Sequence, residues 1–373
     1  MQRKIMASLL TLIVLFALAL PVQADEQIDN SLAWLKTQQQ ADGGFTNGFS
    51  EGSDLGTTCD VLLAIAAAGE DASTWVSDDG LSPLDYLSQQ VSSGAVEILS
   101  LKAKIVMALV STGQDPASFA GADLIADLNA GFDESTGSYG GNTFEQALVM
   151  LALRNAGQPV PAEAAQLLLD SQAEDGAWAL FGETKAGAGD TNTTAMVMQA
   201  LVAAGEEQGL EEALAYLQAV QNGDGGFPYQ SPSEYGTDTD ANSTAVVLQA
   251  LLAAGEALDD WAPVDAGPLE ALDSLYDATT GAFLWQAVVP SPNVLATAQA
   301  IPALVGVTFV ELPSVAAAAA PEAAPATESA VPEEPTATLP SAGGSASWLI
   351  ALASLGALAL GAGLALRRYA ARQ

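Results

Sequence analysis

Apolar positions recur at helical spacing in two kinds of segment that alternate between about residues 25 and 313. Segments of the first kind, such as "SLAWLKTQQ" and "EEALAYLQAVQ", carry one apolar stripe and predict helices that bury a single face. Segments of the second kind, such as "TNTTAMVMQALVAAG", consist largely of Ala, Val, Leu, Met and Gln and end at a glycine. No stretch alternates convincingly with a period of two residues, so we expect helices and no β-sheet.

The second kind of segment is repeated along the chain. "SDLGTTCDVLLAIAAAGED" begins at Ser53, "GDTNTTAMVMQALVAAGEE" at Gly189 and "TDANSTAVVLQALLAAGEA" at Thr239. Alignment on the Ala-Leu-x-Ala-Ala-Gly ending gives six units, each read as helix, glycine loop and helix. Twelve such helices either stack into an open solenoid or close into a ring. The small residues of the second helix favour closure, because the inner helices of a ring must approach one another closely.

A loop with a common pattern joins the two helices of most units, as in "SQAEDGAW" and "VQNGDGGF". A glutamine stands six residues before an aromatic residue in three of these loops, and we expect it to hydrogen-bond helix ends between units while the aromatic ring packs over the loop. The glutamines are Gln39, Gln172 and Gln221, and the aromatic residues are Phe45, Trp178 and Phe227. The unit between about Pro83 and Pro116 lacks the loop but keeps both helical patterns.

The glycine-aromatic loop, followed by Asp-x-x-x-Thr-Ala and an Ala/Leu-rich helix, resembles the prenyltransferase and squalene-cyclase repeat over about residues 28–308. The resemblance implies an all-α fold, an α6/α6 toroid of six helical hairpins. In that family the inner helices line a central cavity, and their N-terminal ends carry the chemistry. The helix starts of this chain are therefore the first place to look for function.

The helix starts of this chain differ from those of the cyclases that they resemble. In those enzymes an Asp-x-Asp-Asp-Thr-Ala motif supplies a proton from its middle aspartate, whereas Asn192 and Asn242 stand at that position here. An amide cannot act as a general acid. The copy that begins at Asp54 has no second carboxylate either. The resemblance therefore implies a cyclase fold without the cyclase proton donor.

Composition argues against the zinc-dependent prenyltransferases of the same superfamily. The chain has no histidine and one cysteine, Cys59, so a zinc site with histidine ligands is excluded. All 45 acidic residues lie between residues 25 and 346, where only five of the ten basic residues lie. A prenyl diphosphate would need several of those basic side chains in one cavity. The negative charge also excludes nucleic acid as a partner, and no metal or certain cofactor is expected.

A third branch of the superfamily resembles the chain more closely in its chemistry: the secreted cobalamin carriers, transcobalamin and intrinsic factor. These toroids enclose a bulky, largely neutral ligand with polar side chains and apolar walls. We therefore expect a non-catalytic protein that binds a small hydrophobic or neutral ligand, with a cobalamin-like corrinoid as one candidate, or a surface partner. Two alternatives stay open: a divergent isoprenoid-processing enzyme, and a structural surface spacer or adhesin module.

The candidate ligand-binding residues lie at the helix starts and in the loops before them. Each aspartate among them has a structural interpretation as well, because a carboxylate that precedes a helix caps its backbone N–H groups for about 0.5–2 kcal/mol. The candidates are Asp54, Thr57, Asn142, Asp190, Asn192, Thr193, Tyr235, Asp240, Asn242, Ser243 and Asn293. We expect none of them to be a metal ligand or a catalytic group.

The two ends of the chain predict export and attachment. Residues 1–24 have the positive start, apolar run and small-residue end of a secretory signal, and the toroid would fill residues 25–313. An Ala/Pro/Glu/Thr-rich linker, residues 314–346, contains "LPSAG", which resembles an LPxTG wall-sorting motif with alanine in place of threonine. An uncharged run at 347–366 is long enough for one transmembrane helix, and residues 367–373 form a basic, cytoplasmic tail. We expect a protein held at the cell surface.

Overall fold

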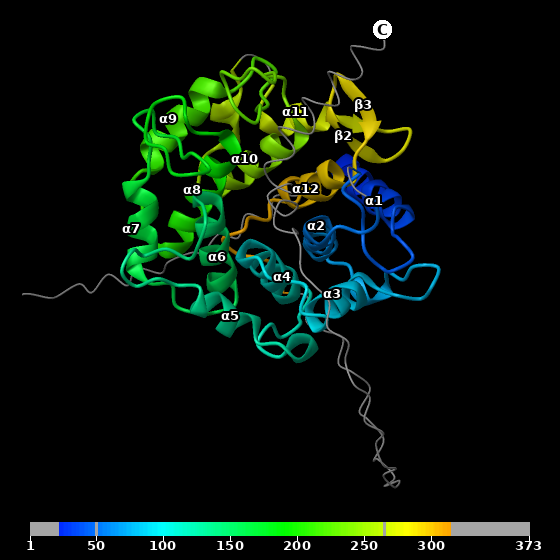
Figure 1. The fold of residues 1–373 in the computed structure, drawn as a ribbon. Coiled ribbons are helices and arrows are strands. Elements are labelled where there is room, and N and C mark those ends of the chain that lie inside the picture. The colour runs from blue at the N-terminus through cyan, green and yellow to red at the C-terminus, as the bar shows by residue number, and fades with distance from the viewer. Residues whose placement is uncertain (1–21, 49–50, 264–265, 315–373) are drawn as a thin grey trace, which may run out of the picture.

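The computed structural model describes residues 22–48, 51–263 and 266–314 (Figure 1). The predicted sorting motif, transmembrane segment and basic tail, and all but the last three residues of the predicted signal, lie outside these ranges. Within them, no helix combines the length and the apolar character that crossing a membrane requires.

The described chain forms twelve α-helices in two concentric rings (Figure 1). Each inner helix contacts the next, and the last contacts the first, so the ring is closed and the open solenoid is excluded. The inner helices are α2 (Leu55–Ala67), α4 (Leu99–Ser111), α6 (Thr143–Asn155), α8 (Thr191–Ala204), α10 (Ala241–Ala253) and α12 (Val294–Leu304). The outer helices are α1 (Val22–Thr37), α3 (Pro83–Ser92), α5 (Leu124–Ala130), α7 (Ala162–Asp170), α9 (Leu210–Val220) and α11 (Pro268–Asp273). The predicted toroid of helical hairpins is confirmed.

The pattern of buried positions explains why the two kinds of segment take different rings. In α2 every residue from Gly56 to Ala66 is buried, so the helix touches neighbours all round. In α9 the buried residues are Ala213, Tyr216, Leu217 and Val220, which share one face at helical spacing. A helix that buries one stripe suits the outer ring, because its opposite face meets water.

In the units that have it, the glycine loop packs against the following unit. Gly176 has φ +87°, and a Cβ added to it would lie 2.1 Å from the backbone oxygen of Glu212 in α9. Gln172 Nε2 donates both to the oxygen of Gly176, at 2.9 Å, and to that of Gly209 just before α9, at 2.8 Å. Gln39 and Gln221 make the corresponding pairs of bonds. The predicted role of these glutamines is confirmed, and only glycine leaves room for the approach.

A buried hydroxyl group ties the same loop back to its own inner helix. Thr194 Oγ1 accepts from the backbone N–H of Trp178 at 2.9 Å and donates to the backbone oxygen of Asp190 at 2.7 Å. The same pair of bonds recurs in two other units, through Thr58 and Thr297. In a third unit Thr244 Oγ1 accepts from the backbone N–H of Phe227. The threonine of the Asp-x-x-x-Thr-Ala pattern is thus a structural residue.

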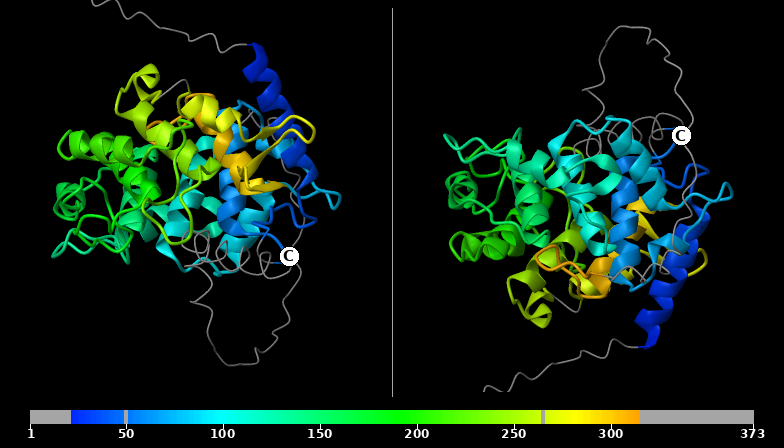
Figure 2. Two further views of the ribbon diagram at one scale, coloured as in Figure 1. Left: turned by 90° about the horizontal axis from the view of Figure 1, so that it is seen from above. Right: turned by 90° about the horizontal axis from the view of Figure 1, so that it is seen from below.

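The expectation of no β-sheet is wrong. Strands β1 (Tyr276–Asp277), β2 (Ala282–Gln286) and β3 (Val289–Pro292) form an antiparallel sheet in the order β1-β2-β3. They have two to five residues each and contain a register shift, so period-two alternation has no room to show. The sheet includes the glycine-aromatic loop of the last unit, with Gly281 in the turn between β1 and β2, and β2 contacts α1, which joins the two ends of the outer ring (Figure 2).

The chain after α12 turns back under the inner ring, as residues 305–314, which we call the floor strap. Gln249 of α10 donates to the backbone oxygen of Val307 at 2.8 Å, and Gln199 of α8 accepts from the backbone N–H of Phe309 at 2.8 Å. Asn155 of α6 donates to the oxygen of Phe309 and accepts from the N–H of Leu312. Three inner helices therefore hold the strap at the ends opposite to their starts.

Candidate functional site

The inner ring surrounds a central cavity that is partly open to solvent. It extends from the starts of the inner helices down to Phe309 in the floor strap. Its lower wall is largely apolar and is formed by side chains of all six inner helices and the strap: Leu63, Met107, Leu148, Met196, Val246, Pro302 and Phe309. An apolar wall of this extent suits a molecule with a largely hydrocarbon body.

The upper wall of the cavity is polar and contains six of the predicted residues. These are Asp54, Thr57, Asp190, Asn192, Thr193 and Asn242. Above it, a second hollow of about 680 Å³, the mouth pocket, is lined by the predicted Tyr235, Asp240 and Ser243, together with Asp238 and Trp285. Asn192, Tyr229 and Asn242 line both spaces. The structure thus brings nine of the predicted residues to one end of the ring, and their role in binding stays a prediction.

Five of the predicted residues are N-caps, each with a side-chain oxygen that accepts from a backbone N–H three residues on. They are Asp54, Asn142, Asp190, Asp240 and Asn293. The structural interpretation of the aspartates is therefore confirmed. Asn142 and Asn293 line neither the central cavity nor the mouth pocket, and capping accounts for both.

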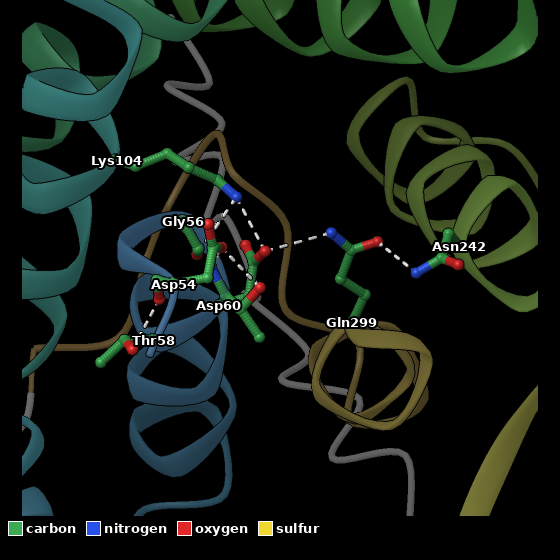
Figure 3. Close-up of polar contacts among 8 residues, drawn as sticks. Asp54, Gly56, Thr58, Asp60, Lys104, Asn242 and Gln299 are labelled. Carbon is green, nitrogen blue, oxygen red and sulfur yellow. Dashed lines mark hydrogen bonds and ion pairs between the residues drawn. The ribbon is translucent and has the colours of Figure 1, made fainter. Parts of the chain in front are cut away.

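A buried ion pair lies in the cavity wall and was not predicted. Lys104 Nζ of α4 lies 2.7 Å from Asp60 Oδ2 of α2, and the two side chains are 13% and 5% exposed. Gln299 of α12 donates to the same carboxylate oxygen at 3.3 Å and accepts from Asn242 of α10 at 2.9 Å (Figure 3). Four inner helices are thereby joined across the polar end of the cavity. The sequence signal was present, because Asp60 and Lys104 are charged residues inside apolar segments.

The two charges of this pair respond differently to burial. Burial by itself lowers the pKa of Lys104, but the adjacent Asp60 carboxylate outweighs that effect, so the pKa of Lys104 is raised and its charge is retained. Burial raises the pKa of Asp60, and Lys104 opposes the rise. Removing either partner would leave the other as an unpaired buried charge, which would destabilise the folded protein.

Two of the capping aspartates have strongly perturbed pKa values. Burial raises the pKa of Asp190 to about 6 and that of Asp240 to about 7, although backbone N–H groups at the helix starts bond the ionised form and oppose the change. Both side chains are 3% exposed. These two acids would change their charge near neutral pH, at the polar end of the cavity.

The raised pKa of Asp240 predicts a pH-dependent stability. The unfolded chain has the ordinary value of 3.8 and the folded chain about 7, so between these pH values the folded state binds more protons and its stability falls as pH rises. Asp240→Asn keeps a good N-cap but removes the buried charge. We expect the variant to be more stable than the parent at pH 8 and equal to it near pH 4. Urea unfolding at both pH values measures the difference, and a constant gap would contradict the assigned pKa.

Two amide oxygens at the polar end have no hydrogen-bond partner. Asn192 Oδ1 and Asn242 Oδ1 are both buried and unpaired. Because most buried polar atoms in proteins are hydrogen-bonded, an unpaired acceptor in a cavity wall is a candidate contact for a ligand. Among the residues that the structure places, no cluster of three or more Cys, Asp or Glu side chains is arranged to hold a metal ion.

Similarity to known proteins is limited to the fold. No protein-family model matches the chain, and a search of curated proteins gives no match. Among solved structures, the type II terpene cyclase MstE from Scytonema is similar with a TM-score of 0.54 and 14% identity, over 76% of this chain and 98% of that one. Haptocorrin in complex with Cbi is similar with a TM-score of 0.51 and 16% identity, over 80% of this chain and 72% of that one.

A third solved structure, UGL with dGlcA-Glc-Rha-Glc, is similar with a TM-score of 0.53 and 14% identity, over 78% of this chain and 98% of that one. The three neighbours differ in what they are described as binding or doing, and they share the arrangement of helices. The class that the fold and the cavity define is therefore an α/α toroid with a central cavity.

Proposed function

We propose that this protein binds a bulky, largely apolar molecule in its central cavity and does not transform it. The observation that carries the proposal is the cavity itself, with an apolar lower wall and a polar end at the helix starts. Binding of this kind needs a shaped hydrophobic space and a few polar contacts. Haptocorrin with Cbi and an MstE variant with geranylgeranyl dihydroxybenzoate, which matches with a TM-score of 0.52, support a toroid that encloses a small molecule. A corrinoid and an isoprenoid are the two ligand classes to test first.

The ends of the chain extend this proposal to a place in the cell. The sequence patterns of residues 1–24 and 347–373 are those of an exported protein with a C-terminal membrane anchor. The described chain ends at Ser314, the last residue of the floor strap, and the predicted anchor follows it in sequence. An exported protein held in this way would meet ligands from outside the cell.

A cavity-filling substitution tests the binding proposal. Val246 in α10 lines the cavity, so Val246→Trp fills part of the space and is expected to weaken binding by more than about tenfold. The full chain is first screened against corrinoids, haems and isoprenoids by thermal unfolding, since a ligand that binds only the folded state raises the midpoint. The control is Val288→Trp, at a position 59% exposed in the turn between β2 and β3. Equal affinity in the two variants would place the ligand elsewhere, and no binder at all would favour the surface spacer.

A second candidate function is a divergent isoprenoid-processing enzyme. The observation in its favour is that Asp190 lines the cavity with a pKa near 6, and an acid of that pKa can donate a proton at neutral pH. The full chain incubated with squalene or a prenyl diphosphate would then give cyclised or transferred product. Asp190→Asn keeps the cap and removes the proton. Product formation that this variant abolishes would replace the binding proposal by the enzymatic one.

A further inference from the structure

The hydrogen bonds that cross the polar end of the cavity have a fixed direction. Lys104 can only donate, and Asp60 Oδ2 accepts both from it and from Gln299 Nε2 (Figure 3). Because the nitrogen of Gln299 is used in this way, its oxygen accepts from Asn242 Nδ2 at 2.9 Å. The buried lysine at one wall therefore fixes the orientation of the Asn242 amide at the other wall, and the oxygen of that amide is left without a donor.

The Oδ1 atom of Asn242 is available to a ligand as a hydrogen-bond acceptor. Asn242 is 4% exposed, lines both the cavity and the mouth pocket, and its Oδ1 has no partner. Asn192 takes the corresponding place in the neighbouring helix α8, also lines both spaces, and has an unpaired Oδ1 as well. A buried acceptor without a donor is unfavourable. A molecule that brings N–H or O–H donors to these two oxygens removes that defect.

The charges around the two oxygens are predominantly negative. Asp190 lines the cavity, and Asp238 and Asp240 line the mouth pocket. Lys104 is the one basic side chain among the described residues that line either space, and Asp60 already pairs with it. At pH 8, where Asp190 and Asp240 are both largely ionised, an anionic group would be repelled here and a cation would be attracted.

We infer that the bound molecule carries a primary ammonium group, held by the oxygens of Asn192 and Asn242 at the junction of the two spaces, with its apolar body in the cavity below. A primary ammonium has three donors, no acceptor and a positive charge, which matches unpaired acceptors among carboxylates. A hydroxyl group brings a donor without the charge, a quaternary ammonium brings the charge without a donor, and a carboxylate brings neither. The inference rests on the proposed function and specifies the polar group of its ligand.

Four molecules with the same ten-carbon chain test the inference: decylamine, decanol, decyltrimethylammonium and decanoate. Calorimetric titration of the full chain is expected to show decylamine binding about tenfold more tightly than decanol, because charge-assisted hydrogen bonds are the stronger ones. Decyltrimethylammonium should bind more weakly than decylamine by a similar factor, and decanoate should bind most weakly.

The matched variants are Asn192→Leu, which removes an unpaired acceptor, and Asn129→Leu, at an exposed position of α5. The first is expected to reduce the preference for decylamine over decyltrimethylammonium to below about threefold, and the second should leave it unchanged. Thermal unfolding confirms that each variant folds. If all four molecules bind equally and Val246→Trp weakens their binding, the inference of an ammonium group is wrong. The proposed function is then still supported. Absence of binding by all four would overturn the inferred ammonium group, and the screen of corrinoids, haems and isoprenoids would then decide the proposed function separately.

Discussion

Replacing Lys104 by methionine is expected to cost about 3–5 kcal/mol of folding free energy at pH 8, because it leaves the Asp60 carboxylate buried without its counter-ion. Asp60 is only 5% exposed and keeps a single long hydrogen bond from Gln299, at 3.3 Å. The loss should shrink at pH 5, where the carboxyl group, whose pKa burial already raises, is more easily protonated. Urea unfolding of the full chain at both pH values measures the effect.

The double variant Lys104→Met/Asp60→Leu shows how much of the loss of stability comes from the unpaired charge and how much comes from lost side-chain packing. Removing both charges leaves no buried ion, so we expect most of the stability to return. Lys102→Met is the matched control, since this lysine pairs with Asp127, whose side chain is 44% exposed, and its loss should cost less than about 1 kcal/mol. If Lys104→Met costs no more than this control, the pair at the cavity is hydrated and does not hold the inner helices together.

The second large effect is expected from Gly176→Ala, which should destabilise the protein by about 3 kcal/mol or more. The new Cβ would lie 2.1 Å from the backbone oxygen of Glu212, a rigid neighbour in the next outer helix. The positive φ of +87° adds a backbone penalty of its own. Thermal and urea unfolding are the measurements.

Gly205→Ala isolates the backbone term. Gly205 ends α8 with φ +81°, and a Cβ there would meet nothing within 4 Å. We expect a loss of about 1–2 kcal/mol from the left-handed conformation alone. The excess cost of Gly176→Ala then measures the contact between units. Equal costs would mean that the loop can move away from α9, and that the glycine is required only for its backbone angle.

Features that depend on neighbours in sequence could be predicted well. The helices, their N-caps at Asp190 and Asp240, and the role of Gln172 follow from patterns a few residues long, repeated often enough to stand out. The closed ring followed from the small residues of the inner helices, because only close packing uses them. The resemblance to the cyclase repeat then gave the place of the cavity.

Features that depend on distant contacts could not be predicted. Asp60 and Lys104 are 44 residues apart, and Gln299 lies 239 residues beyond Asp60, so only the closed ring brings them together. The floor strap has no pattern of its own, since it is held through backbone atoms by side chains such as Asn155, 154 residues before Phe309. The sheet of residues 276–292 was missed because its strands are too short to show a period.

The floor strap has a kinetic consequence. Phe309 and its neighbours are fixed by hydrogen bonds at the far end of the ring, so we expect a ligand to enter and to leave through the mouth pocket. A second ligand would then not displace the first from the far side, so the bound ligand must dissociate before another one binds. The residence time of a ligand would then depend on the mouth pocket near Tyr235 and Trp285. Substitutions there should change the dissociation rate of the ligand more than its contacts in the cavity.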